Sequence, residues 1–124
     1  MAGKKATVLL VEDDKMIIDM YTLKFTQEGY EVIQAENGQD GIDLASVKNP
    51  DIILLDIILP QVDGFTVLKT LKSNPKVKDI PVVLLTNLGQ DGDVKKGLEM
   101  GAVDYLIKAN FTPSQVVDKV KSVL

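Results

Sequence analysis

Polar side chains that can do chemistry stand where apolar segments of this chain end. Glu12 and Asp13 follow the segment ATVLLV, and Asp56 closes the segment DIILLD. Thr86 closes IPVVLLT, and Lys108 follows AVDYLI. Moving an unpaired carboxylate out of water costs several kcal/mol or shifts its pKa. A charge such as Asp56 at the end of a buried segment therefore indicates a partner group or a functional site.

The acidic residues at these positions favour a bound cation. Two carboxylates about 4 Å apart repel each other by roughly 4 kcal/mol at an effective dielectric constant of about 20. Glu12, Asp13 and Asp56 make three such pairs, and their summed repulsion would rival the stability of a small domain. A divalent cation together with Lys108 would neutralise these carboxylates. Oxygen ligands without histidine or cysteine favour Mg²⁺ or Mn²⁺ over Ca²⁺, which takes more protein oxygens.

A site of this composition suits phosphoryl transfer. The cation and Lys108 can neutralise charge on the phosphoryl oxygens, while the Thr86 hydroxyl donates a hydrogen bond. Asp56 can act as the nucleophile and would then carry an acyl phosphate. The chain contains neither cysteine nor histidine, which excludes disulfides, thiolate sites and every Ser-His or Cys-His arrangement.

Length and composition indicate one globular domain. The chain has 124 residues, of which 45% are hydrophobic and 26% are charged. Its 14 basic and 18 acidic residues give a net charge of −4, which argues against a general nucleic-acid-binding surface. No apolar run reaches the roughly 18–20 residues of a membrane span. The start, MAGKKATVLLVE, has only a short apolar part and no cleavage site, so we expect a cytoplasmic protein without membrane contact.

Apolar segments alternate with amphipathic segments along the chain, five of each. We predict strands at 6–11, 30–35, 51–56, 80–86 and 102–107. We predict helices at 14–28, 38–48, 63–73, 91–100 and 112–123. This alternation predicts a doubly wound α/β sheet of five parallel strands with helices on both faces. In such sheets ligands bind beyond the carboxyl ends of the strands, where the polar residues above would meet.

Some polar residues and glycines near the expected site have a simpler structural explanation. Asp14 and Asp63 are expected to cap the helices that follow them, and we assign neither of them chemistry. Glycines punctuate the region of the fourth helix, at positions 89, 92, 97 and 101. An interior helical glycine costs roughly 1 kcal/mol relative to alanine. The region is therefore either a weak helix tolerated by packing or a segment that rearranges when the site changes state.

Four segments resemble the receiver domain of two-component response regulators, in particular the single-domain, chemotaxis-regulator type. They are LLVEDD at 9–14, LLDIILPQVDGF at 54–65, VVLLTN at 82–87 and GAVDYLIK at 101–108. The segments span nearly the whole chain in the order and spacing of that family. The resemblance implies a flavodoxin-like strand order, 2-1-3-4-5, within a single domain of residues 1–124 whose ordered core begins at about residue 5.

Carried over position by position, the resemblance assigns a metal site and a phosphoacceptor. Glu12 and Asp13 resemble the acidic pair that holds Mg²⁺, Asp13 directly and Glu12 through a water molecule. Asp56 resembles the phosphoacceptor, which is also a metal ligand. Ile58 would contribute its backbone carbonyl to the metal, a role that does not depend on its side chain.

The same resemblance assigns the residues that respond to phosphorylation. Thr86 resembles the switch hydroxyl that moves to the phosphoryl group, and Lys108 resembles the lysine that pairs with that group. Tyr105 resembles the aromatic switch residue whose inward rotation accompanies phosphorylation. Without the resemblance, a tyrosine in a strand would simply be assigned a packing role.

Two positions depart from the usual pattern of the family, and two others bear on the lifetime of the phosphoryl group. Ala109 follows Lys108 where receivers normally have proline, often after a cis peptide. A non-proline cis bond costs about 2.5–4 kcal/mol, which favours a trans peptide, but the sequence leaves the isomer open. Asn87 is larger and more polar than the small residue usual after the switch threonine. Ile58 and Leu88 occupy the two positions that tune phosphoryl lifetime in this family. Because two apolar side chains cannot orient an attacking water, we predict slow loss of the phosphoryl group.

The function that these observations favour is a phosphorylation-dependent signalling receiver. By resemblance, it would accept a phosphoryl group from a phosphohistidine on a sensor histidine kinase or a histidine phosphotransfer protein, and would catalyse this step itself. Phosphorylation would change the face formed by the fourth helix, fifth strand and fifth helix. A downstream output protein or domain, or a second copy in a phosphorylation-dependent homodimer, would bind there. The chain is either a stand-alone regulator or one domain of a longer protein.

Three other functions fit parts of the pattern. A Mg²⁺-dependent aspartyl-phosphate hydrolase typically has a second acid two residues after the nucleophile, where this chain has Ile58. A flavodoxin-like FMN-binding protein would have a Ser/Thr/Gly-rich phosphate loop after its first strand, whereas this chain has three acidic residues. A pseudo-receiver that binds partners without phosphorylation would not need the complete set of acid, hydroxyl and lysine.

Overall fold

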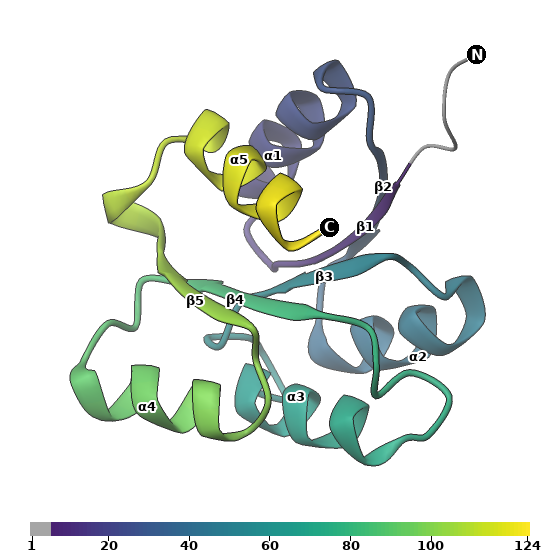
Figure 1. The fold of residues 1–124 in the computed structure, drawn as a ribbon, viewed down its shortest axis with the longest axis vertical. Coiled ribbons are helices and arrows are strands. Elements are labelled where there is room, and N and C mark those ends of the chain that lie inside the picture. The colour runs from purple at the N-terminus through teal and green to yellow at the C-terminus, as the bar shows by residue number, and fades with distance from the viewer. Residues whose placement is uncertain (1–5) are drawn as a thin grey trace.

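Five parallel strands form one sheet with helices on both faces, as the sequence predicts (Figure 1). The computed structural model describes residues 6–124; the predicted extension of the domain to residues 1–5 lies outside them. The strand order is β2-β1-β3-β4-β5, and every neighbouring pair is parallel. In chain order the elements are β1 (Thr7–Val11), α1 (Lys15–Gln27), β2 (Glu31–Ala35), α2 (Gly38–Lys48), β3 (Ile52–Leu55), α3 (Gly64–Ser73), β4 (Val82–Thr86), α4 (Asp91–Glu99), β5 (Asp104–Ile107), the short 3-10 helix η1 (Lys108–Asn110) and α5 (Pro113–Val123).

Two apolar layers hold the helices to the sheet. Helices α1 and α5 cover one face, and α2, α3 and α4 cover the other (Figure 1). Alternate side chains of the central strands enter the two layers: Leu9 and Ile53 lie beneath α2–α4, whereas Val8 and Ile52 lie beneath α1 and α5. Burial on both faces explains why the central strands read as nearly continuous apolar runs. These strands form a rigid support that fixes the residues at their ends.

Some strands are shorter than predicted at their N-terminal ends. β4 begins at Val82 instead of residue 80, and β5 begins at Asp104 instead of residue 102. Ile80 and Ala102 are nevertheless buried, at 8% and 7% exposure. The sequence pattern reflects the burial of side chains, and here this burial begins before the first residue of each strand.

Asp14 and Asp63 cap α1 and α3, as predicted. Asp14 Oδ1 accepts a hydrogen bond from the Met16 N–H at 2.9 Å, and Asp63 Oδ1 accepts one from the Thr66 N–H at 3.1 Å. Each side chain thereby satisfies a backbone donor that the first turn of its helix leaves without an intrahelical partner. Both caps set where the helices begin next to the strand ends.

Close packing explains one of the glycines around α4. A Cβ at Gly97 would lie 2.5 Å from Leu84 Cδ1 and 3.1 Å from Tyr105 Cδ2, whereas a Cβ at Gly92 would meet no atom within 4 Å. Gly101 has a φ of +108°, which L side chains rarely adopt, and it ends the turn after α4. Gly97 therefore lets α4 lie directly on β4 and β5. Rearrangement of this segment with the state of the site remains a prediction.

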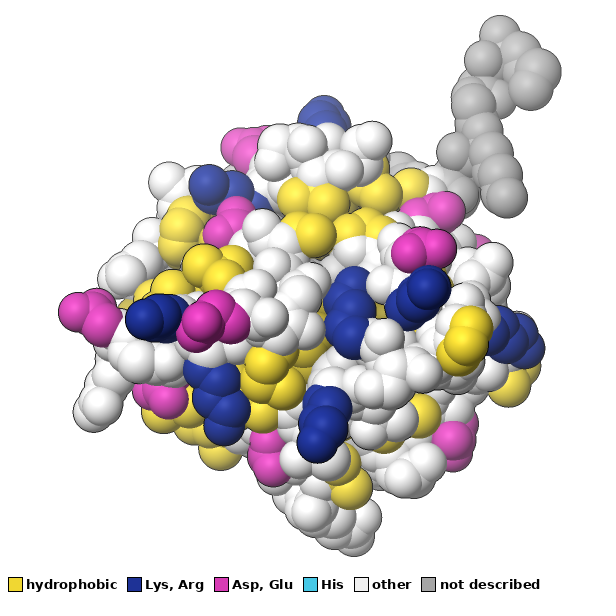
Figure 2. All heavy atoms as spheres, turned by 60° about the horizontal axis from the view of Figure 1, so that its bottom comes forward, with side chains coloured by type: hydrophobic (Ala, Val, Ile, Leu, Met, Phe, Trp, Pro, Cys, Tyr) yellow, Lys and Arg dark blue, Asp and Glu magenta, His cyan; other side chains and the backbone are white. Residues whose placement is uncertain are grey.

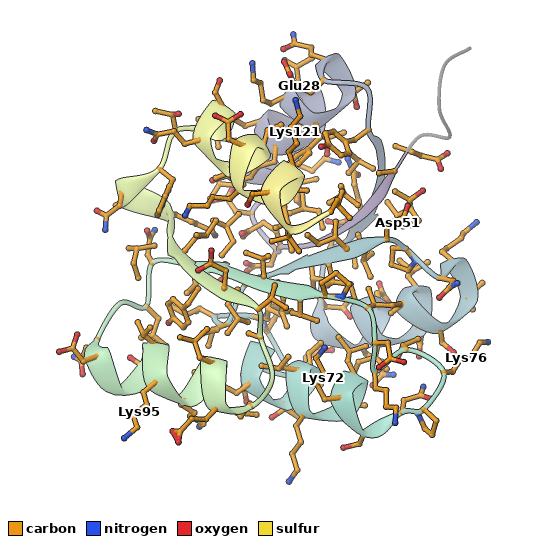
Figure 3. All side chains as sticks on the ribbon, in the orientation of Figure 1. Glu28, Asp51, Lys72, Lys76, Lys95 and Lys121 are labelled. Atoms are coloured by element: carbon orange, nitrogen blue, oxygen red, sulfur yellow. The ribbon has the colours of Figure 1, made fainter. Side chains whose placement is uncertain are left out.

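The surface around α3 and α4 carries mixed charges. Figure 2, with this side of the molecule turned forward, shows basic, acidic and hydrophobic side chains interspersed. Lys72 of α3, labelled in Figure 3, donates hydrogen bonds to the carbonyls of Lys78 at 3.0 Å and Ile80 at 3.1 Å. Burial lowers its pKa, and its role is to hold the segment before β4. Among residues 6–124, no helix has the length and apolar character needed to cross a bilayer.

Candidate functional site

Glu12 and Asp56 lie side by side because β1 and β3 are parallel and in register. Val11, the last residue of β1, pairs with Leu55, the last residue of β3. Glu12 directly follows β1 and Asp56 directly follows β3. The Asp56 N–H donates a hydrogen bond to the Val11 carbonyl at 3.1 Å. Glu12 is 2% exposed and Asp56 is 6% exposed. Two buried carboxylates therefore meet at the carboxyl edge of the sheet.

Asp13 completes an acidic cluster with these two residues. One carboxylate oxygen from each of Glu12, Asp13 and Asp56 lies within 4.8 Å of the others. Asp13 is exposed, so the cluster is open to solvent on that side. The backbone of Ile58 lies against the cluster, since its N–H donates to Asp56 Oδ1 at 3.2 Å. Hard oxygen donors in this arrangement can hold a small divalent cation that retains several waters.

Lys108 connects the acidic cluster to the end of β5. Its Nζ lies 2.8 Å from Asp56 Oδ2 and also contacts Glu12 Oε2. The Lys108 side chain is 10% exposed, so this charge is largely shielded from water. No cis peptide bond occurs among the described residues. The Lys108–Ala109 peptide is therefore trans, and Lys108 reaches both carboxylates from this backbone.

Burial and neighbouring charges shift the pKa values within the cluster. Burial raises the pKa of Glu12 from its ordinary value of 4.5 to about 7, although the hydrogen bonds from Lys108 and from the Asp14 backbone lower it. Burial alone would lower the pKa of Lys108, but its hydrogen bonds to Asp56 and Glu12 outweigh this effect and raise it. Lys108 is thus charged at neutral pH, whereas Glu12 exchanges a proton there. A proton and a metal ion would compete for Glu12.

Thr86 and Tyr105 both contact Leu88, in the loop between β4 and α4. Thr86 is fully buried, and its Oγ1 accepts a hydrogen bond from the Leu88 N–H at 3.3 Å. Tyr105 is 8% exposed, and its hydroxyl donates to the Leu88 carbonyl. Burial is the main cause that raises the pKa of Tyr105 to about 12, so the hydroxyl keeps its proton and remains a donor at neutral pH. Leu88 is therefore held by both residues that have predicted switch roles.

Sequence reasoning missed two features beside the site. The Ala109 N–H donates to Asn87 Oδ1 at 3.1 Å; the departures from the family pattern at 87 and 109 were the signal that pointed there. Next to this bond, a cavity of about 330 Å³ opens between α1 and the segment that joins β5 to α5. Its lining residues are Ile17, Met20, Tyr21, Asn87, Lys108, Ala109, Phe111 and Pro113.

Comparison with known sequences relates this chain to receiver domains. The family described as the response regulator receiver domain matches residues 8–121. The DNA-binding dual master transcriptional regulator RpaA of Synechocystis is 41% identical over 117 residues, which cover 94% of this chain and 48% of that protein. The phosphate regulon transcriptional regulatory protein PhoB of Pseudomonas aeruginosa is 38% identical over 124 residues, which cover 100% of this chain and 53% of that protein. The chain spans about half the length of these two regulators.

Comparison with solved structures gives the same relationship. The chemotaxis protein CheY4 of Vibrio cholerae matches with a TM-score of 0.90 at 28% identity, covering 98% of this chain and 100% of that chain. The fold of this chain is therefore the flavodoxin-like fold of that protein, with the strand order that the sequence resemblance implies.

Proposed function

The chain belongs to the family of response regulator receiver domains, and we propose that it is a phosphorylation-dependent signalling receiver with Asp56 as its phosphoacceptor. The observation that supports this proposal most strongly is the contact of Lys108 with both Asp56 and Glu12, with Asp13 beside them. These groups stand beyond the carboxyl ends of parallel strands, where ligands bind in this class of fold.

Mg²⁺, or Mn²⁺ in its place, fits the proposed site because three hard oxygen donors converge there. Asp13 and Asp56 would hold the cation directly, Glu12 would hold it through a water molecule, and Ile58 would contribute its backbone carbonyl. When bound, the cation supplies positive charge next to the phosphoryl oxygens. The acidic pair at the end of β1 would thus serve to position it.

In the proposed transfer, a carboxylate oxygen of Asp56 attacks the phosphorus of a phosphohistidine. The new P–O bond forms as the P–N bond breaks, and the leaving imidazole keeps the electron pair of that bond. The donor would be a sensor histidine kinase or a histidine phosphotransfer protein, since this chain contains no histidine. Lys108 already lies at the attacking carboxylate and would pair with the transferred phosphoryl group. Because the Lys108 ammonium group is held in place before the reaction, it would need no reorganisation during the transfer.

The response to phosphorylation would pass through Leu88. The Thr86 hydroxyl would leave the Leu88 N–H, to which it is now bonded, and would donate to a phosphoryl oxygen. The Leu88 carbonyl accepts from Tyr105, so a movement of this loop would also reach β5. Phosphorylation would thereby shift a two-state equilibrium of the α4–β5–α5 face. An output protein or domain, or a second phosphorylated copy, would bind to that face in the cytoplasm.

The alternative functions have weaker support. A hydrolase of aspartyl phosphates would use an acid two residues after Asp56, but this position is Ile58, whose apolar side chain is 60% exposed. A receiver that works without phosphorylation would not require Lys108 to lie on two buried carboxylates. Slow loss of the phosphoryl group, which the apolar Ile58 and Leu88 predict, would further separate a signalling receiver from a hydrolase.

A small phosphodonor tests the proposal before any donor protein is known. The purified chain is incubated with acetyl phosphate and either Mg²⁺ or a chelator, and its intact mass is measured. We expect the mass to increase by one phosphoryl group with Mg²⁺ and to stay unchanged with the chelator. If the mass stays unchanged in both samples, the proposed function is wrong; an equal gain in both samples would contradict the metal requirement.

A further inference from the structure

Asn87 and Ala109 form a hydrogen bond that joins the two chain segments carrying Thr86 and Lys108. The Ala109 N–H donates to Asn87 Oδ1 at 3.1 Å. Asn87 directly follows Thr86, the last residue of β4, and Ala109 directly follows Lys108. The bond thus lies one residue beyond each of the two polar groups that the proposed function uses at this edge of the sheet.

The bond continues the connection between β4 and β5 after their ladder has ended. The last rung of the ladder pairs Thr86 with Ile107. After it, the chain enters the three-residue helix Lys108–Asn110, where the main chain of β4 no longer serves as a partner. The side-chain oxygen of Asn87 takes over as the acceptor for the Ala109 N–H. Alanine supplies a donor here that proline would lack, and asparagine supplies an acceptor that a small apolar residue would lack.

A cavity borders this segment on one side, although Phe111 packs against the apolar layer beneath α1 and α5. The cavity of about 330 Å³ borders Lys108, Ala109 and Phe111, so open space lies there in place of packed side chains. Within the segment, the Phe111 N–H donates to the Lys108 carbonyl at 3.3 Å. Among residues 6–124, the bond to Asn87 is therefore the side-chain hydrogen bond that extends the connection to β4 beyond the last ladder rung, on the C-terminal side of Lys108.

We propose that Asn87 is a positioning residue, which holds the backbone at Ala109 so that the Lys108 amino group stays on Asp56 and Glu12. The role of Asn87 in placing Lys108 is inferred from this hydrogen bond and does not depend on the proposed function. Its consequence for phosphoryl transfer rests on the proposed function. Asn87 is itself exposed, so substitutions there leave the core intact.

The rate at which the Lys108 amino group reacts with a labelling reagent shows how firmly this group is held on Asp56 and Glu12, and it can be measured without phosphorylation. Brief labelling with acetic anhydride, read peptide by peptide by mass spectrometry, gives the rate at Lys108 relative to the exposed Lys95. Asn87→Leu keeps the size of the side chain but removes the acceptor, whereas Asn87→Asp keeps an acceptor oxygen. Since one hydrogen bond is removed, we expect the Lys108 to Lys95 ratio to rise about three- to tenfold in Asn87→Leu. The ratio in Asn87→Asp should stay within about twofold of wild type.

A second substitution separates the hydrogen bond from other effects of position 87. Ala109→Pro removes the donor, so Asn87→Leu should change the labelling ratio no further in that background. A wild-type ratio in Asn87→Leu, or an equal rise in both backgrounds, would overturn the proposal. Phosphorylation by acetyl phosphate should slow in Asn87→Leu by a similar factor. If the wild type takes up no phosphoryl group, the proposed function is wrong, and the labelling ratios still decide the role of Asn87.

Discussion

Lys108 Nζ lies 2.8 Å from Asp56 Oδ2, and this ion pair spans the width of β4, which separates β3 from β5 in the sheet. The two residues are 52 positions apart in the chain. The pair holds a buried carboxylate and a shielded ammonium group together before any phosphoryl group arrives. The site is therefore organised in advance for the charge that phosphoryl transfer would bring to it.

Removal of the Lys108 charge should destabilise the metal-free protein. Lys108→Met leaves Glu12 and Asp56 buried without their cationic partner, which costs about 3 kcal/mol or more of unfolding free energy. Urea denaturation at pH 7.5 with a chelator measures this change. Lys95→Met removes the same charge from an exposed position and should change stability by less than about 0.5 kcal/mol. Equal stability of the two variants would contradict a role for Lys108 in compensating the buried carboxylates.

Magnesium should stabilise the protein through Asp13. A ligand that binds only the folded state adds about 2.7 kcal/mol of stability at a hundredfold excess over its Kd, so the Tm should rise with Mg²⁺ concentration. Asp13→Asn should abolish most of this rise. Asp14→Asn removes the neighbouring charge but preserves the helix cap, since asparagine also caps helices, and it should keep the rise. Differential scanning fluorimetry with both variants provides the measurement, and loss of the rise in both would show that general charge, not the cluster, binds the ion.

Stability without metal should fall as the pH rises from about 5 to about 7. The pKa of Glu12 is about 7 in the folded state and 4.5 ordinarily, so between these values the folded state binds more protons than the unfolded chain. Raising the pH therefore lowers the free energy of unfolding, on the order of 3 kcal/mol across this window. Lys108 titrates above this window because its pKa is raised. Urea denaturation at several pH values should show this fall in wild type and a flatter dependence in Glu12→Gln; identical dependences would argue against the buried Glu12.

Two glycines of α4 should respond to alanine in opposite ways. Gly97→Ala places a Cβ 2.5 Å from Leu84 Cδ1, and we expect it to lower the free energy of unfolding by about 1–3 kcal/mol. Gly92→Ala meets no atom within 4 Å and should raise it by about 0.5–1 kcal/mol through helix propensity. Thermal and urea unfolding of the two variants provide the comparison. Stabilisation by both substitutions would mean that α4 does not pack closely on β4.

The sequence predicts the fold well because its apolar segments show which residues are buried and its alternation of strands and helices shows the order of the elements. Apolar segments at regular intervals identify all five strands, and the parallel arrangement then places Glu12 and Asp56 at one edge. Strand ends are less well predicted, since Ile80 and Ala102 are buried without joining the ladder. Helix caps such as Asp14 are predicted because their hydrogen bonds are local.

The sequence does not reveal two features that depend on details of the folded chain. The bond from Ala109 to Asn87 joins residues 22 positions apart, and it depends on where the β4–β5 ladder ends. The raised pKa of Glu12 depends on its burial in the folded chain. Residue types alone predict neither this hydrogen bond nor the raised pKa, although the residues at 87 and 109 are unusual for the family and indicate where the hydrogen bond lies.

Asp56 as the phosphoacceptor is tested most directly by the intact mass of wild type and Asp56→Asn after incubation with Mg²⁺ and acetyl phosphate. Asp63→Asn is a matched control, because it changes an acid in the same β3–α3 region while retaining a helix-capping side chain. We predict that wild type and Asp63→Asn each gain one phosphoryl group and that Asp56→Asn gains none. Gain of a phosphoryl group by Asp56→Asn equal to that of wild type would contradict the assignment.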